Sequence, residues 1–151
     1  MGAMPWFKRL LGDADSAETP DQVAVESATV GGLNFLTAIQ AHMKWKTRLD
    51  QYIAGTSSED LKVEVVSRDD QCVLGKWLHG EGGTKYRHLP LFGDIMSNHA
   101  NFHVCAGHVL KTARSGDKEG ARGLLARGEY PRASEKVKNQ LATLYVSIRE
   151  Q

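Results

Sequence analysis

The sequence predicts an all-α fold, an up-and-down bundle of four to five helices in a single domain. Two observations carry this prediction. Apolar residues recur at spacings of three and four along several segments, which is the period of an amphipathic helix. Polar or glycine-containing breaks separate these segments, and no convincing strand pair or internal repeat accompanies them.

Size, composition and charge narrow the class of protein. The chain has 151 residues, of which 41% are hydrophobic and 25% charged, as in an ordinary folded domain. Its net charge of +1 gives no reason to expect a nucleic-acid partner. No apolar run approaches the roughly 20 residues of a membrane helix, and no secretory signal is visible. We therefore expect a cytoplasmic protein without stable membrane insertion, whose cysteines stay reduced.

Residues 1–22 are expected to lie outside the bundle. The first three residues, before Met4, are typical of a cloning remnant. Residues 5–11 are apolar and basic, and they suit a docking peptide, a membrane-surface anchor or a leader that packs on the domain. Residues 12–22 are acidic and rich in small side chains, which is typical of a linker. The bundle itself is predicted over residues 23–151.

The first half of the bundle is predicted to hold one long and one short helix. Helical periodicity runs from about Val23 to Ala54, where Gly55 ends it. Residues 56–70 are mostly polar and predict a loop with at most one helical turn. A short helix is expected over residues 71–79, capped by Asp69 or Asp70 and ended by the glycines that follow.

The second half continues with three helices. The second long helix is predicted over residues 91–114, with His99 and His103 within or beside its apolar stripe. Asp117 is expected to cap a helix that ends near Gly128. Pro131 then interrupts the chain before a last helix, whose apolar residues are Val137, Leu141, Leu144, Tyr145 and Ile148.

A candidate metal site emerges from four side chains. His99 and His103 are four residues apart, so one face of a helix presents both imidazoles one turn apart. On this spacing alone, a metal site and hydrogen-bonded core histidines are equally supported. His42 lies on the inner face of the first long helix, and Cys72 lies in the first turn of a short one, where the helix N-terminus favours a thiolate.

The donor types select the metal. Three imidazoles and one thiolate form a set that Zn²⁺ accepts as a closed tetrahedral site, whereas Mg²⁺ and Ca²⁺ prefer oxygen. Four protein ligands leave no position for a substrate. The residue after His99 is alanine and not the glutamate that a zinc peptidase of the His-Glu-x-x-His type uses as its base, which argues against a hydrolase.

Three blocks of sequence, taken in order, resemble the chemoreceptor zinc-binding domain (CZB) family. The first holds His42 three residues before Trp45, the second is the segment CVLGKWL at residues 72–78, and the third holds His99 and His103 with Phe102 between them. The resemblance spans roughly residues 33–148, and the second block is its most specific part.

This resemblance implies a bacterial helical bundle, often dimeric, whose zinc is held by three histidines and one cysteine. These ligands correspond to His42, Cys72, His99 and His103. The family usually controls an attached chemoreceptor or diguanylate cyclase in response to zinc or to oxidants such as hypochlorous acid. No such domain is visible in this chain, so we expect a stand-alone module that forms a homodimer and acts on a signalling protein in trans.

We therefore expect a zinc-binding sensor, not an enzyme, in which the Cys72 thiolate responds to zinc level or to oxidant. Two alternatives remain open at this stage, a zinc-dependent hydrolase and a purely structural or zinc-buffering helical protein. Cys105 is expected to be a small buried thiol outside the site, and His79, His88 and His108 are expected in surface or loop positions.

Overall fold

A computed structural model of the chain describes residues 28–150. The expected cloning remnant, leader and linker, and the start of the first predicted helix, lie outside the described residues. Within them the chain forms a two-residue hairpin followed by helices. In chain order the elements are β1 (Thr29–Val30), β2 (Leu33–Asn34), α3 (Phe35–Ala54), α4 (Val63–Val66), α5 (Val73–His79), α6 (Glu81–Tyr86), α7 (Pro90–Arg114), α8 (Lys118–Ala126) and α9 (Glu129–Arg149).

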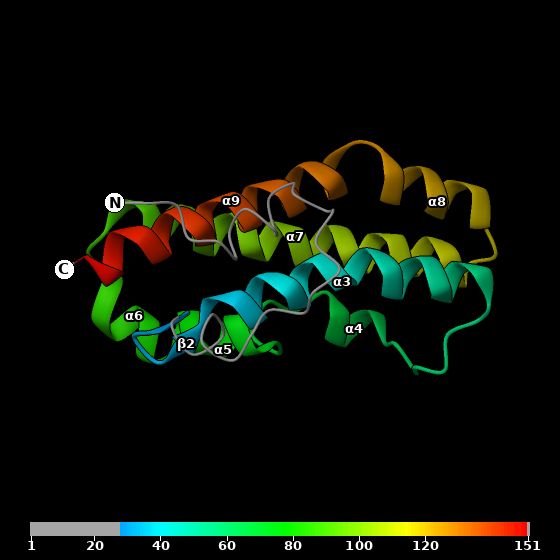
Figure 1. Cartoon of the computed structure of the whole chain (residues 1–151). Coiled ribbons are helices and arrows are strands. Elements are labelled where there is room, and N and C mark those ends of the chain that lie inside the picture. Colours follow the sequence, from blue (N-terminus) through cyan, green and yellow to red (C-terminus); the bar gives the residue numbers. More distant parts are fainter. Residues whose placement is uncertain (1–27, 151) are drawn as a thin grey trace, which may run out of the picture.

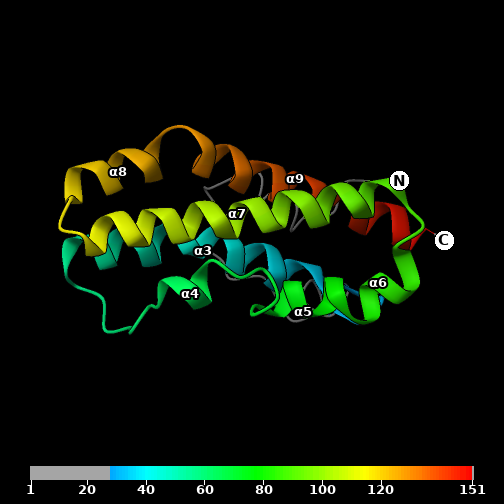
Figure 2. The same ribbon diagram turned by 180° about the vertical axis from the view of Figure 1, so that it is seen from behind.

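The helices form an elongated bundle with four legs. Helix α3 runs along the molecule from the hairpin, and the short helices α4, α5 and α6 lead the chain back (Figure 1). Helix α7 then runs the full length, and α8 and α9 return along it (Figure 2). The all-α prediction is confirmed except for the small hairpin. No helix among residues 28–150 is long and apolar enough to cross a membrane.

The core lies where α3, α7 and α9 meet. Phe35, Phe92, Phe102 and Tyr145 are almost fully buried there, and the rings of Phe35 and Tyr145 lie 5.5 Å apart. The stripe predicted on α7 is buried at Phe92, Ile95, His99, Phe102, His103, Ala106 and Leu110, whereas Met96 and Ala113 are half-buried. Both histidines of this stripe therefore face the interior of the bundle.

The prediction of a helix already at residues 28–34 is wrong. Thr29 pairs with Asn34 and Val30 with Leu33 in an antiparallel hairpin. Its turn is Gly31–Gly32, where both φ angles are positive, at 62° and 89°, a region that favours glycine over any other residue. Helix α3 starts only at Phe35, because the Asn34 side chain accepts a hydrogen bond from the Thr37 N–H at 2.9 Å and caps it.

Two further boundaries differ from the prediction. The short helix α5 does end at His79, with Gly80 as its C-cap, but a further short helix, α6, follows at once. Gly82 of α6 packs under the ring of Trp77, where a side chain would not fit. Pro131 does not interrupt the chain but lies in the first turn of α9, where its missing N–H has no helical partner to lose. The predicted helical turn within residues 56–70 and the Asp117 cap of α8 are confirmed.

Candidate metal centre

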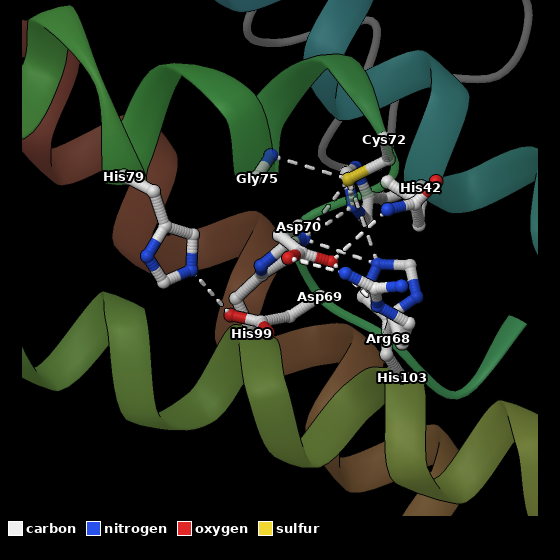
Figure 3. A network of polar contacts seen from close by, with 10 residues as sticks. His42, Arg68, Asp69, Asp70, Cys72, Gly75, His79, His99 and His103 are labelled. Carbon is white, nitrogen blue, oxygen red and sulfur yellow. Dashed lines mark hydrogen bonds and ion pairs between the residues drawn. The ribbon is translucent and has the colours of Figure 1, made fainter. Parts of the chain in front are cut away.

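The structure brings the four predicted side chains together from three parts of the fold. His42 comes from α3, Cys72 precedes α5, and His99 and His103 come from α7 (Figure 3). Their ligand atoms all lie within 4.8 Å of one another. The three histidines are buried and Cys72 is half-buried. Residues 57 positions apart, such as His42 and His99, thus share one polar site inside an apolar core.

Backbone carbonyl groups orient two of the three imidazoles. The Nδ1–H of His42 donates to the Ala38 carbonyl oxygen, one turn earlier in α3, at 2.9 Å. The Nδ1–H of His103 donates to the Val66 carbonyl oxygen, at the end of α4, also at 2.9 Å. Because a carbonyl oxygen only accepts, each ring carries its proton on Nδ1 and turns the lone pair of Nε2 toward the site.

Five of the six separations between donor atoms suit a tetrahedral zinc site. Zn–N bonds of about 2.0–2.1 Å and a Zn–S bond of about 2.3 Å imply N···N separations of roughly 3.3 Å and N···S separations of roughly 3.6 Å. The Nε2 of His99 lies 3.1 Å from the Nε2 of both His42 and His103. The Sγ of Cys72 lies 3.3, 3.6 and 3.8 Å from the Nε2 atoms of His99, His103 and His42.

The third imidazole has an unmatched ring nitrogen. His99 is fully buried, and its Nδ1 has no hydrogen-bond partner. Burial lowers the pKa of His99 to about 2 and that of His42 to about 4, and it also lowers the pKa of His103. All three rings are therefore neutral near pH 7, which is the protonation state that a metal ligand requires.

The side chain of Cys72 caps α5. The prediction that Asp69 or Asp70 would cap this helix is therefore wrong. Its Sγ accepts a hydrogen bond from the Gly75 N–H at 3.2 Å. The expectation that the helix N-terminus makes the thiolate favourable holds only in part, because burial outweighs the backbone donors of Gly75 and Leu74 and raises the pKa of the thiol. A nearby cation is needed to keep this sulfur deprotonated.

Glycine at position 75 lets the preceding loop approach the helix. A Cβ atom there would overlap the backbone carbonyl oxygen of Asp69. A Cβ at Gly107 of α7 would likewise overlap the Ser67 side chain. The loop from Ser67 to Asp70 is therefore clamped between α5 and α7, which fixes Cys72 on one side and the Val66 carbonyl group on the other. The sequence favoured close packing at Gly75, which the structure confirms, but it did not single out Gly107.

A cleft opens beside the site. Its volume is about 530 Å³, and its wall includes His42, Cys72 and His103. The rest of the lining is mainly apolar and comes from α3, α4 and the start of α5, with Val65 and Val73 exposed. Two of the charged groups in its lining are paired, since Arg48 binds Glu59 at 2.7 Å and Arg68 binds Asp70 at 2.9 Å. A small solute can therefore approach the sulfur.

The remaining histidines and the second cysteine stay outside the cluster. His79 is exposed and its Nε2 lies 2.8 Å from Asp69 Oδ2, while His88 and His108 are exposed. Cys105 is half-buried and is not among the four converging groups. The three histidines lie as predicted, and Cys105 lies outside the site as predicted but is half-buried where a buried thiol was expected.

Residues 42–110 match the family model of the chemoreceptor zinc-binding domain. This segment is similar to the CZB family, the family that the sequence was found to resemble. The matched segment begins at His42 and ends in α7, so it includes all four converging side chains. Neither a curated protein nor a solved structure matches the chain significantly. The CZB family and the three-histidine, one-cysteine cluster together identify Zn²⁺ as the cofactor.

Proposed function

We propose that this CZB domain is a zinc-dependent sensor of bacterial signalling, with His42, Cys72, His99 and His103 as the zinc ligands. One observation carries the proposal. Four donor atoms of the types that zinc prefers converge within 4.8 Å of one another, with two of the rings already oriented by backbone carbonyl groups. The donors come from α3, α7 and the start of α5, so the state of the site affects how these elements sit together.

The closed ligand set favours sensing over catalysis. A hydrolytic zinc site has three protein ligands and keeps one position for water, whereas here a fourth protein ligand supplies that position. A purely structural or zinc-buffering role would use the same four ligands. The cleft favours sensing over these roles, because it gives a small oxidant a path to the half-buried Cys72 sulfur.

The chemistry of the signal lies on Cys72. When bound, the zinc ion holds this sulfur as a thiolate at neutral pH. A peroxide transfers one oxygen atom to the thiolate and leaves as hydroxide or water, and Cys72 becomes a sulfenic acid. The oxidised sulfur has lost its negative charge and binds a cation more weakly. The start of α5 then loses one of its attachments to α3 and α7, which is a local change within a persisting bundle.

The proposal also includes the assembly of the domain and its signalling partner. Residues 23–151 form one up-and-down bundle, which dimerises with a second copy in the cytoplasm. Its output passes to a separate signalling protein of the chemoreceptor or diguanylate cyclase type. The four-leg arrangement of residues 28–150 and the CZB match at residues 42–110 support this setting. Sedimentation of the purified chain tests the dimer.

The first experiment measures metal content and the response to oxidant in three proteins. The wild type is expected to hold about one zinc per chain, because one ion satisfies all four donors. Cys72→Ser should keep its helical circular dichroism, hold zinc less tightly and release none on addition of hydrogen peroxide. Cys105→Ser is the matched control and should behave as the wild type. A wild type without zinc, or equal peroxide responses in all three proteins, would contradict the proposal.

A further inference from the structure

Trp77 joins the metal-binding side of the bundle to the hairpin. Its indole Nε1–H donates to the Gly31 carbonyl oxygen at 2.8 Å, across 46 residues of sequence. The ring is only 6% exposed and lies 5.6 Å from Phe35, edge to face, and 5.9 Å from Phe92. One side chain of α5 thus contacts the hairpin turn, the start of α3 and the start of α7.

The hairpin turn fits closely against α6. A Cβ atom at Gly31 would overlap the Tyr86 ring, and one at Gly32 would overlap the Glu81 carboxylate. Both of these side chains belong to α6, which packs on α5 and whose Gly82 lies under the Trp77 ring. The turn is therefore seated on the α5–α6 pair, and displacement of this pair must disturb the turn.

Helix α5 is attached at its start through the metal site. Cys72 is five residues before Trp77, so the backbone positions of these two residues lie about 7–8 Å apart along the helix axis. Two other contacts involve α5: the pair between Asp69 and His79, and the close approach of Gly75 to the backbone of Asp69. Both contacts are with the loop that leads into α5. This loop moves with the helix, so these contacts do not fix α5 to α3 or α7.

We propose that Trp77 is a positioning residue that couples occupancy of the metal site to the β1–β2 hairpin. When the Cys72 ligand is lost, α5 shifts, the hydrogen bond to Gly31 weakens, and the hairpin loosens. The response to metal removal does not depend on the proposed sensing of oxidants. The response to Cys72 oxidation does rest on that function.

The test is amide hydrogen exchange of residues 29–35 in the full chain, with zinc bound and after removal of zinc by a chelator. Removal is expected to speed exchange in the wild-type hairpin about fivefold, the change that corresponds to losing one hydrogen bond. Trp77→Phe keeps a ring in the cluster but lacks the N–H donor. Its hairpin should exchange fast in both states, with no further response to zinc.

Phe92→Leu is the matched control, because it loosens the same aromatic cluster from α7 without removing the bond to Gly31. Its hairpin should keep the wild-type response to zinc. Equal exchange in the two states of the wild type would overturn the proposal. So would a wild-type response in Trp77→Phe, or the same loss of response in Phe92→Leu, since the effect would then not depend on the indole N–H.

A second measurement needs no variant. The indole N–H resonance of Trp77 in the wild type should exchange faster with solvent once zinc is removed, and an unchanged resonance would overturn the proposal even if Trp77→Phe does not fold. Hydrogen peroxide added to the zinc-bound protein separates the two proposals. A hairpin that responds to the chelator and not to peroxide retains the coupling and refutes oxidant sensing.

Discussion

Replacing Gly75 by alanine should damage the metal site without touching a ligand. The added Cβ would overlap the Asp69 carbonyl oxygen, which belongs to the backbone and has little room to move because the same loop is also clamped at Gly107. Overpacking of this kind typically costs about 1–3 kcal/mol of stability, offset in part by the gain of about 1 kcal/mol for alanine over glycine in a helix. A net loss of up to about 2 kcal/mol is expected.

The effect on zinc should exceed the effect on stability. The Gly75 N–H is the hydrogen-bond donor to the Cys72 sulfur, and displacing it moves the sulfur relative to the three imidazoles. Changes to groups that orient a ligand typically weaken metal binding about 10–100-fold. Competition against a coloured chelator measures the zinc affinity, and urea denaturation with excess chelator measures the stability of the metal-free chain.

Gly93→Ala supplies the matched control. Gly93 also lies inside a helix, and a Cβ atom there meets nothing within 4 Å. This variant should gain up to about 1 kcal/mol of stability and bind zinc as the wild type does. If Gly75→Ala and Gly93→Ala bind zinc equally tightly, the close approach of Asp69 does not position the sulfur and the reasoning fails.

Three further predictions concern stability. Between pH 6.5 and about 4, the unfolded chain binds protons that buried, neutral His42 and His99 exclude, because their pKa values fall to about 4 and about 2. The metal-free domain should therefore lose about 1.4 kcal/mol per pH unit for each of these rings as the pH falls, as urea titrations at pH 7 and 5 with chelator can check. Chelation at pH 7 should lower the thermal midpoint while most helical circular dichroism remains, since the apolar contacts among α3, α7 and α9 do not depend on the metal; complete loss of helix would contradict this. Asn34→Ala should cost about 1 kcal/mol in urea denaturation through the lost cap of α3, and Asn34→Ser should restore most of it.

The sequence was sufficient to predict which four side chains converge, because their signals are local or come from a recognisable block. The spacing of His99 and His103 places both rings on one helix face, and the structure buries both. The mutual placement of His42 and Cys72 with that pair depends on how α3 and α5 pack, which periodicity alone does not specify. The family resemblance supplied that information in advance.

The errors arose where tertiary contacts outweigh local preference. In the sequence, Gly31 and Gly32 were interpreted as residues that weaken a helix. In the structure their φ angles are positive and they form a turn that contacts Trp77 and Tyr86. The run of glycines after His79 has poor helix propensity, yet it forms α6 because small residues fit beneath Trp77. Two aspartates precede α5, but the cysteine sulfur caps it instead, an acceptor that capping preferences do not include.

The hydrogen bonds that orient His42 and His103 end on backbone oxygens, at Ala38 and Val66. Every amino acid carries such an oxygen, so the chemical identity of the side chain at these two positions does not determine how the rings are aimed. Substitutions there that keep the helical backbone and the local volume should leave the rings in place. In a redesign of this centre for another metal, the main chain would therefore already orient two of the imidazoles. Only the orientation of His99 could be set by a designed side-chain partner.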